Sequence, residues 1–300
     1  LLPHAPRGAV LLALPPMEER KGALPVCLAL GRELAARGIA ALLVDWSGCG
    51  DSEGDFDSTP PRAFEEACEA ALAWLEQSLP LTPRALLGVR AAAPVACRVA
   101  RAHPELAGLV LWSPVAGPDF LRQLMQRRMV NDMVAYGKAR DSRAALESEL
   151  RDGRFVDMDG YAVTGAFYAW AQSLSLEPTS LPTWLATGGH DEKAAAALAS
   201  QAPTLTQSAL RYPPFWNTVG HVDVSALVRE TADWLAARFT GPGHDAPDWS
   251  EPCVCRLGEL VDLTPSPVVR AALDRRAKPP RGGVLFLNGW SGVCTGPHRL

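Results

Sequence analysis

The residues best placed to do chemistry lie in a short turn between an apolar run and an alanine-rich segment. Gly88, Val89 and Arg90 end the apolar run, and Ala91 and Ala92 begin a helical pattern. A strand, a sharp turn and a helix in this order form a nucleophile elbow, written G-x-S-x-G, which exposes a serine Oγ at its tip. The tip residue here is Arg90. A guanidinium has no nucleophilic lone pair, so the elbow is predicted to be present without its nucleophile.

Two further residues stand where a catalytic acid and a catalytic histidine are expected. Asp191 follows an apolar run at 183–187, and His221 lies 30 residues later, before an amphipathic segment at 225–239. The acid would orient the imidazole and stabilise its protonated form. Asp191 equally fits the N-cap of a helix at 193–200, and His221 equally fits a surface position, so both interpretations stay open.

Arg90 would bring a fixed positive charge next to the N–H groups of a helix N-terminus. This combination favours an anionic ligand such as a carboxylate, a phosphate or a sugar acid. Val89 and Ala91 flank it at the elbow. The alternative is that Arg90 pairs with an internal carboxylate such as Asp191, which would close the site.

A charged loop follows the first apolar run, with Glu18, Glu19, Arg20 and Lys21 in sequence. In an active enzyme with this architecture, the same loop contributes a backbone N–H to an oxyanion hole. Glu18 and Arg20 are therefore predicted to take part in ligand binding, within an ion network around Arg90. The alternative is an ordinary solvated turn.

A second loop, residues 45–52, reads D-x-x-G-x-G-x-S directly after an apolar run at 39–44. Its glycines permit a tight turn beside the site. Replacement nucleophiles are available on strand-end loops at Ser47, Cys49, Ser52 and Ser113, although Cys49 is embedded in the glycine turn.

The elements that must position these residues alternate between apolar strands and amphipathic helices. Strands are predicted at 9–14, 39–44, 84–88 and 106–112, and helices at 24–36, 63–79 and 91–102. Strands without a two-residue period indicate a parallel sheet covered on both faces. Residues 117–178 show charged, helix-period segments, which predict a helical cap, and strands resume at 183–187 and 208–212.

Together these features resemble the α/β-hydrolase superfamily, in which nucleophile, acid and histidine follow one another along the chain. We expect the α/β-hydrolase fold, with a mostly parallel sheet, helices on both faces and a cap insertion. A closer resemblance is to the exosortase A system-associated hydrolases of type 2. It is carried by the segments PPMEERK at 15–21, DWSGCGDSEG at 45–54, GVR at 88–90 and PFWNT at 214–218. It implies that arginine at the elbow is a feature of the group, and it implies a bacterial exopolysaccharide and protein-sorting setting.

Charge, hydropathy and cysteine content argue against several other classes of protein. A net charge of -4 gives no basic footprint for nucleic acid, and no apolar run approaches the length of a membrane span. Cys253-x-Cys255 lacks a second pair at zinc spacing, so neither a metal nor another cofactor is expected. The scattered cysteines suggest reduced thiols in the cytoplasm.

We expect residues 1–240 to form the hydrolase-like domain, 241–250 a linker and 251–300 the start of a second, truncated domain of the same type. Residues 283–289 repeat the glycine and apolar strand of 8–14, and the last residues resemble the opening of the companion hydrolase type. Both ends suggest a window from a longer tandem protein.

Three functions follow from these expectations. The first is a hydrolase-like protein that binds a small anionic or acyl ligand without serine-type catalysis. The second is an active esterase or thioesterase that uses Asp191 and His221 with a non-elbow nucleophile or water. The third is a non-catalytic scaffold for a second hydrolase module in the same chain.

Overall fold

The central element is a six-stranded parallel sheet with the strand order β2-β1-β3-β4-β7-β8. In this computed structural model, the described residues are 1–50, 52, 54–190, 192–218, 220, 222–245, 259–265 and 268–273. The strands are β1 Gly8–Ala13, β2 Ile39–Val44, β3 Arg84–Val89, β4 Gly108–Trp112, β7 Thr183–Ala186 and β8 Leu205–Gln207. The central strands are fully buried because both of their faces are covered, which is why their sequences are unbroken apolar runs.

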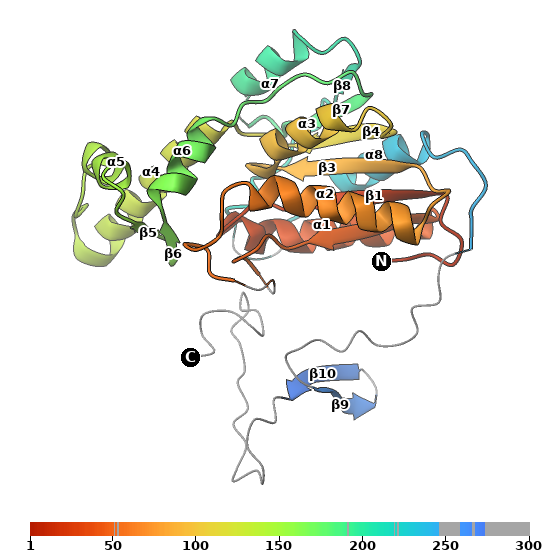
Figure 1. The fold of residues 1–300 in the computed structure, drawn as a ribbon, viewed down its shortest axis with the longest axis horizontal. Coiled ribbons are helices and arrows are strands. Elements are labelled where there is room, and N and C mark those ends of the chain that lie inside the picture. Colours follow the sequence, from red (N-terminus) through yellow and green to blue (C-terminus); the bar gives the residue numbers. More distant parts are fainter. Residues whose placement is uncertain are drawn as a thin grey trace. The chain divides into compact units, whose positions relative to one another are not determined.

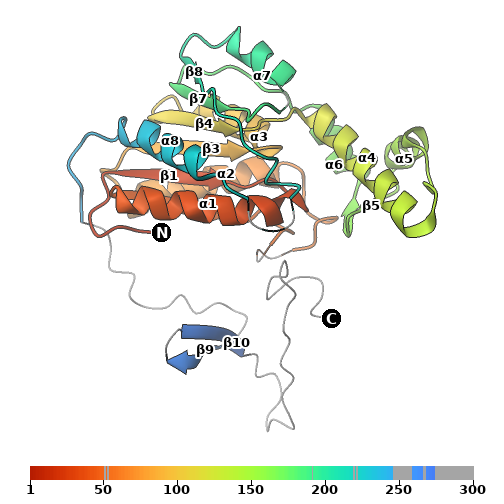
Figure 2. The same ribbon diagram turned by 180° about the vertical axis from the view of Figure 1, so that it is seen from behind.

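Helices cover both faces of the sheet (Figures 1 and 2). Helices α1 Glu19–Ala36 and α8 Ser225–Ala236 pack on one face, and α2 Ala63–Ser78 and α3 Ala92–Ala102 on the other. Alternate residues of β1 contribute to the two apolar layers: Leu11 belongs to the layer under α2 and α3, and Leu12 to the layer under α1 and α8. A short helix, α7 Glu192–Ala199, connects β7 and β8. The predicted α/β class, with a mostly parallel sheet and helices on both faces, is confirmed.

The chain between β4 and β7 forms a helical insertion beside the ends of β3 and β4 (Figures 1 and 2). It contains α4 Gly117–Tyr136, α5 Arg143–Arg151 and α6 Gly165–Gln172, together with an antiparallel hairpin of β5 Val156–Met158 and β6 Tyr161–Val163. Two of these helices begin at side-chain caps, where Ser142 accepts from the backbone N–H of Ala145 and Thr164 from that of Phe167. This hairpin was not predicted, although its Asp-Gly turn at 159–160, where both φ angles are positive, is a strong hairpin signal.

One strand prediction was wrong in position. The strand expected at 208–212 lies earlier, at Leu205–Gln207, and residues 208–212 contribute only an isolated bridge between Arg211 and Gly188. β8 is an edge strand with two exposed polar residues, so no apolar run in the sequence indicates it. Tyr212, which suggested the later strand, is buried outside any strand, and its hydroxyl donates to the Ala186 carbonyl. The sequence also suggests a hairpin formed by residues 253–257 and 260–263, of which 253–257 lie outside the described residues.

The chain divides into two units, Leu1–Ala246 and Pro247–Leu300. Within the second, β9 Glu259–Pro265 pairs antiparallel with β10 Val268–Leu273. The repeat expected at 283–289 lies outside the described residues. None of the helices in the described part of the chain has the length and hydropathy needed to cross a membrane.

A charged cluster links α2 to the end of α3. His103, which follows the last residue of α3, places Nδ1 2.7 Å from Glu105 Oε1 and Nε2 2.5 Å from Glu69 Oε2. Partial burial by itself lowers the pKa of His103, but the hydrogen bonds to Glu105 and Glu69 outweigh it and raise the pKa above its usual value. The protonated imidazole, which has two donors, is therefore the form that joins the two helices.

Because the pKa of His103 is raised in the folded state, its stabilising effect is complete below the unfolded pKa of about 6.5 and is lost as the pH rises through the folded pKa. We predict that His103→Gln lowers the free energy of unfolding at pH 6 but not at pH 9. The loss should be below about 1 kcal/mol, since the partners are partly solvated. Urea unfolding at the two pH values measures it. The exposed His4→Gln is the control, and a His103→Gln loss that is equal at both pH values would contradict the prediction.

Candidate functional site

The predicted elbow is present as a strand, a sharp turn and a helix. Arg90 sits between β3 and α3 with a φ of 54°, a left-handed conformation that residues with a Cβ rarely adopt. Its carbonyl accepts from Ala93 N at 3.0 Å, which starts α3. Gly88 allows α3 to approach the strand, because a Cβ there would lie 2.7 Å from Ala96 Cβ. The backbone thus has the form of a nucleophile elbow.

The Arg90 side chain is buried in polar contacts. It is 1% exposed, with Nε donating to Glu19 Oε2 at 3.3 Å and Nη2 donating to Glu19 Oε1 at 3.4 Å. Nη1 donates to the carbonyl of Ser113 at 3.0 Å, and Nη2 also donates to Gln123 Oε1 at 2.6 Å. The guanidinium carbon lies 4.2 Å from the centroid of the Trp216 ring. One cation therefore joins α1, the end of β4, α4 and the loop that carries Trp216.

Among the described residues, the carboxylate that forms an ion pair with Arg90 is that of Glu19. Its side chain is 3% exposed, so both members of the pair are removed from water. A buried pair of this kind is costly to break, because the remaining charge would be left uncompensated. Asp191 and His221 lie outside the described residues and stay predictions.

The neighbouring charges of the first loop have other partners. Arg20 binds Asp45 through two hydrogen bonds, of 2.6 Å from Nε and 2.5 Å from Nη2. Gly50 makes room for this pair, since a Cβ there would lie 2.7 Å from Arg20 Cζ. Glu18 forms a half-exposed ion pair with Lys21 at 2.8 Å. The ion network expected around Arg90 is therefore made by Glu19, and Arg20 instead anchors the D-x-x-G-x-G loop.

Three of the four replacement nucleophiles are poorly suited to attack a substrate. Cys49 is 2% exposed, and burial raises the pKa of its thiol to about 11, which leaves little reactive thiolate. Ser113 is fully buried, with its Oγ 2.9 Å from the Tyr212 hydroxyl and 3.2 Å from the Thr187 carbonyl. Ser52 donates its hydroxyl to the Asp45 carbonyl. None of these three contacts a histidine among the described residues.

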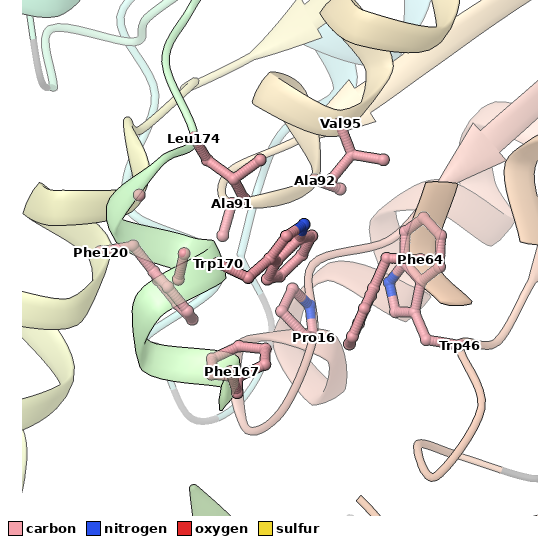
Figure 3. A pocket seen from close by; sticks show the side chains of 12 residues that line it. Pro16, Trp46, Phe64, Ala91, Ala92, Val95, Phe120, Phe167, Trp170 and Leu174 are labelled. Atoms are coloured by element: carbon pink, nitrogen blue, oxygen red, sulfur yellow. The ribbon is translucent and has the colours of Figure 1, made fainter. Parts of the chain in front are cut away.

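An apolar slot lies over the start of α3 (Figure 3). The slot is narrow: its cavity volume is about 10 Å³, so a ligand larger than a water molecule can enter only if the lining side chains move apart. Its lining comes from the loops after β1 and β2, from the elbow, from α2, α3, α4 and α6, and from Leu174, two residues beyond the end of α6. The lining residues are Pro16, Trp46, Phe64, Ala91, Ala92, Val95, Gly117, Phe120, Phe167, Trp170, Ala171 and Leu174. The slot thus occupies the carboxyl ends of parallel strands, where ligands bind in open α/β sheets.

The charged side chains near the elbow do not line the apolar slot. Ala91, a predicted ligand-binding residue, lines the slot, whereas Val89, Arg90, Glu18 and Arg20 are absent from its lining. The aromatic residues of α2 and α6 were not predicted to form a site. Phe64 was visible only as a periodic core position, and Phe167 and Trp170 only as parts of a helical segment.

Comparison with solved structures identifies the architecture. Est1E from Butyrivibrio proteoclasticus, with ferulic acid bound, is similar with a TM-score of 0.58 and 14% identity, over 78% of this chain and 90% of that one. A proline iminopeptidase-related protein from Thermus thermophilus gives a TM-score of 0.50 and 19% identity, over 80% and 92% of the two chains. The chain has the α/β-hydrolase fold. No protein-family model and no curated protein matches the sequence.

At 14% and 19% sequence identity, these similarities show the fold alone. What chemistry this chain can do must therefore be inferred from its own residues. The elbow retains the left-handed backbone of the fold, and its tip residue is occupied by internal contacts. The slot above it is lined entirely by apolar residues.

We predict that Arg90→Met lowers the free energy of unfolding by about 3–5 kcal/mol, because it leaves the Glu19 carboxylate buried without its partner. The double variant Arg90→Met/Glu19→Met should recover much of this loss, since an apolar pair of similar volume removes the desolvation cost. Chemical denaturation measures both variants.

The control is Lys21→Met, which breaks a half-exposed ion pair on the same helix turn and should cost less than about 1 kcal/mol. An Arg90→Met loss no larger than that of Lys21→Met would show that the pair is not a major source of stability.

Proposed function

We propose that this protein is a non-hydrolysing α/β-hydrolase-fold protein that binds a small uncharged acyl or aryl ligand in the apolar slot. The observation that carries the proposal is the position of Arg90. It occupies the nucleophile's place on a correctly formed elbow, yet its side chain is buried against Glu19, Ser113 and Gln123. An acyl-enzyme cannot form on a guanidinium.

The same contacts favour an acyl ligand over an anionic one. An anion drawn to Arg90 would have to compete with the Glu19 carboxylate, which is already paired and shielded from water. Within the slot, no lining residue carries a charge, so an ionised ligand would lose its hydration without compensation. An apolar body such as an acyl chain or an aromatic ring gains from the same surroundings.

The proposal also covers the biological role, the domain organisation and the cellular location of the protein. The resemblance to exosortase A system-associated hydrolases supports a role in bacterial exopolysaccharide loci. In the proposed organisation, residues 117–178 are the cap of the first hydrolase-like domain, residues 241–250 are a linker, and residues 251–300 begin a second hydrolase-like module. A cytoplasmic location is supported by four buried cysteines of the described chain that are free thiols, Cys27, Cys49, Cys68 and Cys97.

We predict that the wild-type protein is not labelled by a serine-directed fluorophosphonate and does not turn over p-nitrophenyl esters. The physical reason is that the elbow lacks a hydroxyl, and that Cys49 and Ser113 are buried. Gel fluorescence and absorbance assays measure these outcomes. Specific labelling that disappears in His221→Ala would instead establish the alternative, an active esterase with a non-elbow nucleophile.

We predict that methyl benzoate binds the wild-type protein and that Ala92→Leu weakens this binding at least about tenfold, because the added side chain fills the slot. Titration calorimetry measures both affinities. Ala73→Leu adds the same atoms at an exposed position of α2 and should leave the affinity unchanged. Equal affinities of wild type and Ala92→Leu would place the ligand elsewhere.

A further inference from the structure

One polar atom stands out within the apolar slot. The indole Nε1 of Trp170 is buried and has no hydrogen-bond acceptor among the described residues. Trp170 lines the slot, and Figure 3 shows its ring inside the slot, with the nitrogen on the side of Ala92 and Val95. A buried donor without a partner is uncommon in native structures and calls for an explanation.

Two fully buried tryptophans, by comparison, have acceptors for their indole N–H groups. Trp46, which lines the same slot, donates its Nε1 to the carbonyl of Leu14 at 2.5 Å. Trp112, in the core, donates to Thr231 Oγ1 at 3.0 Å. Of these three tryptophans, Trp46 and Trp112 have a hydrogen-bond acceptor for the indole N–H, and Trp170 has none among the described residues.

The Trp170 ring is held in place by aromatic neighbours. It stacks on Phe64 with ring centroids 5.0 Å apart and an interplanar angle of 24°, and it lies 5.4 Å from Phe167. Phe64 belongs to α2 and Phe167 precedes Trp170 by about one turn of α6, so the ring is fixed from two elements. Rotating the N–H toward solvent would break this stack, so the donor is preorganised in its buried position.

We propose that the Trp170 N–H is the specificity-determining donor of the slot, and that it selects ligands carrying an uncharged oxygen acceptor on an apolar body. Esters, ketones and amides of aromatic or short acyl groups belong to this class. Hydrocarbons lack the acceptor, and carboxylates carry a charge that no lining residue balances. This inference rests on the proposed function and adds the chemical class of the ligand.

The test compares methyl benzoate with sec-butylbenzene, which has the same number and branching of non-hydrogen atoms but no oxygen. Trp170 is replaced by 3-benzothienylalanine, which keeps the bicyclic shape and lacks the N–H, and by phenylalanine in a second variant. We expect the ratio of the two affinities, favouring the ester, to fall about tenfold in both variants, the worth of one hydrogen bond. The affinity for sec-butylbenzene should stay constant in the isosteric variant.

A spectroscopic readout accompanies the affinities. In the wild-type protein, the indole N–H proton resonance of Trp170 should move downfield when methyl benzoate is added and not when sec-butylbenzene is added. Trp74→Phe, an exposed tryptophan of α2, is the control and should leave the affinity ratio unchanged.

The outcomes separate the inference from the proposed function. If both probes bind and the ratio is unaffected by replacing Trp170, the inference is overturned while binding in the slot stands. If neither probe binds, the proposed function fails and the inference with it. If benzoate binds more tightly than methyl benzoate, the ligand is an anion and the assigned class is wrong.

Discussion

The buried pair of Arg90 and Glu19 is the interaction on which the organisation of the site depends. A cation at the tip of the elbow lies in a region of low dielectric and requires compensation, which Glu19 supplies from the first turn of α1, where a negative charge is also favoured by the helix dipole. The remaining donors of Arg90 reach the Ser113 carbonyl and Gln123. The guanidinium thus holds the first helix, the sheet and the insertion together at the point where a nucleophile would otherwise attack a substrate.

Two neighbouring sets of residues with different chemistry therefore meet at the elbow. Arg90, Glu19 and Gln123 form a polar cross-link at the elbow, and the aromatic slot, lined in part by α4 and α6, reaches the elbow at Ala91 and Ala92. Nucleophilic catalysis requires a reactive atom that faces the substrate, and the elbow no longer supplies one. Binding requires only the slot, which the fold still forms. The separation of the charge from the slot is the physical basis for proposing an uncharged ligand.

Much of the sheet was predictable because its central strands are buried on both faces, and their apolar runs, such as 9–14, mark them in the sequence. The partners of the charged loop were not. Helix α1 was expected from residue 24 and begins at Glu19, so Glu19, Arg20 and Lys21 lie on successive positions about 100° apart and turn toward Arg90, Asp45 and Glu18. The slot could not be predicted either, since Phe64 and Trp170 come from distant helices whose packing no local pattern encodes. Edge strand β8, polar and exposed, lacks the apolar signal altogether.

The most direct measurement is an NMR titration of the arginine side chains in uniformly ¹⁵N-labelled protein. The Nε–H of Arg90 is hydrogen-bonded to Glu19 in a side chain that is 1% exposed, so its resonance should exchange slowly with water and keep its position when benzoate or inorganic phosphate is added. Its assignment follows from its absence in Arg90→Met. A saturable shift and faster exchange of this resonance on adding either anion would contradict the central claim, because Arg90 would then be a ligand anchor and not an internal ion pair.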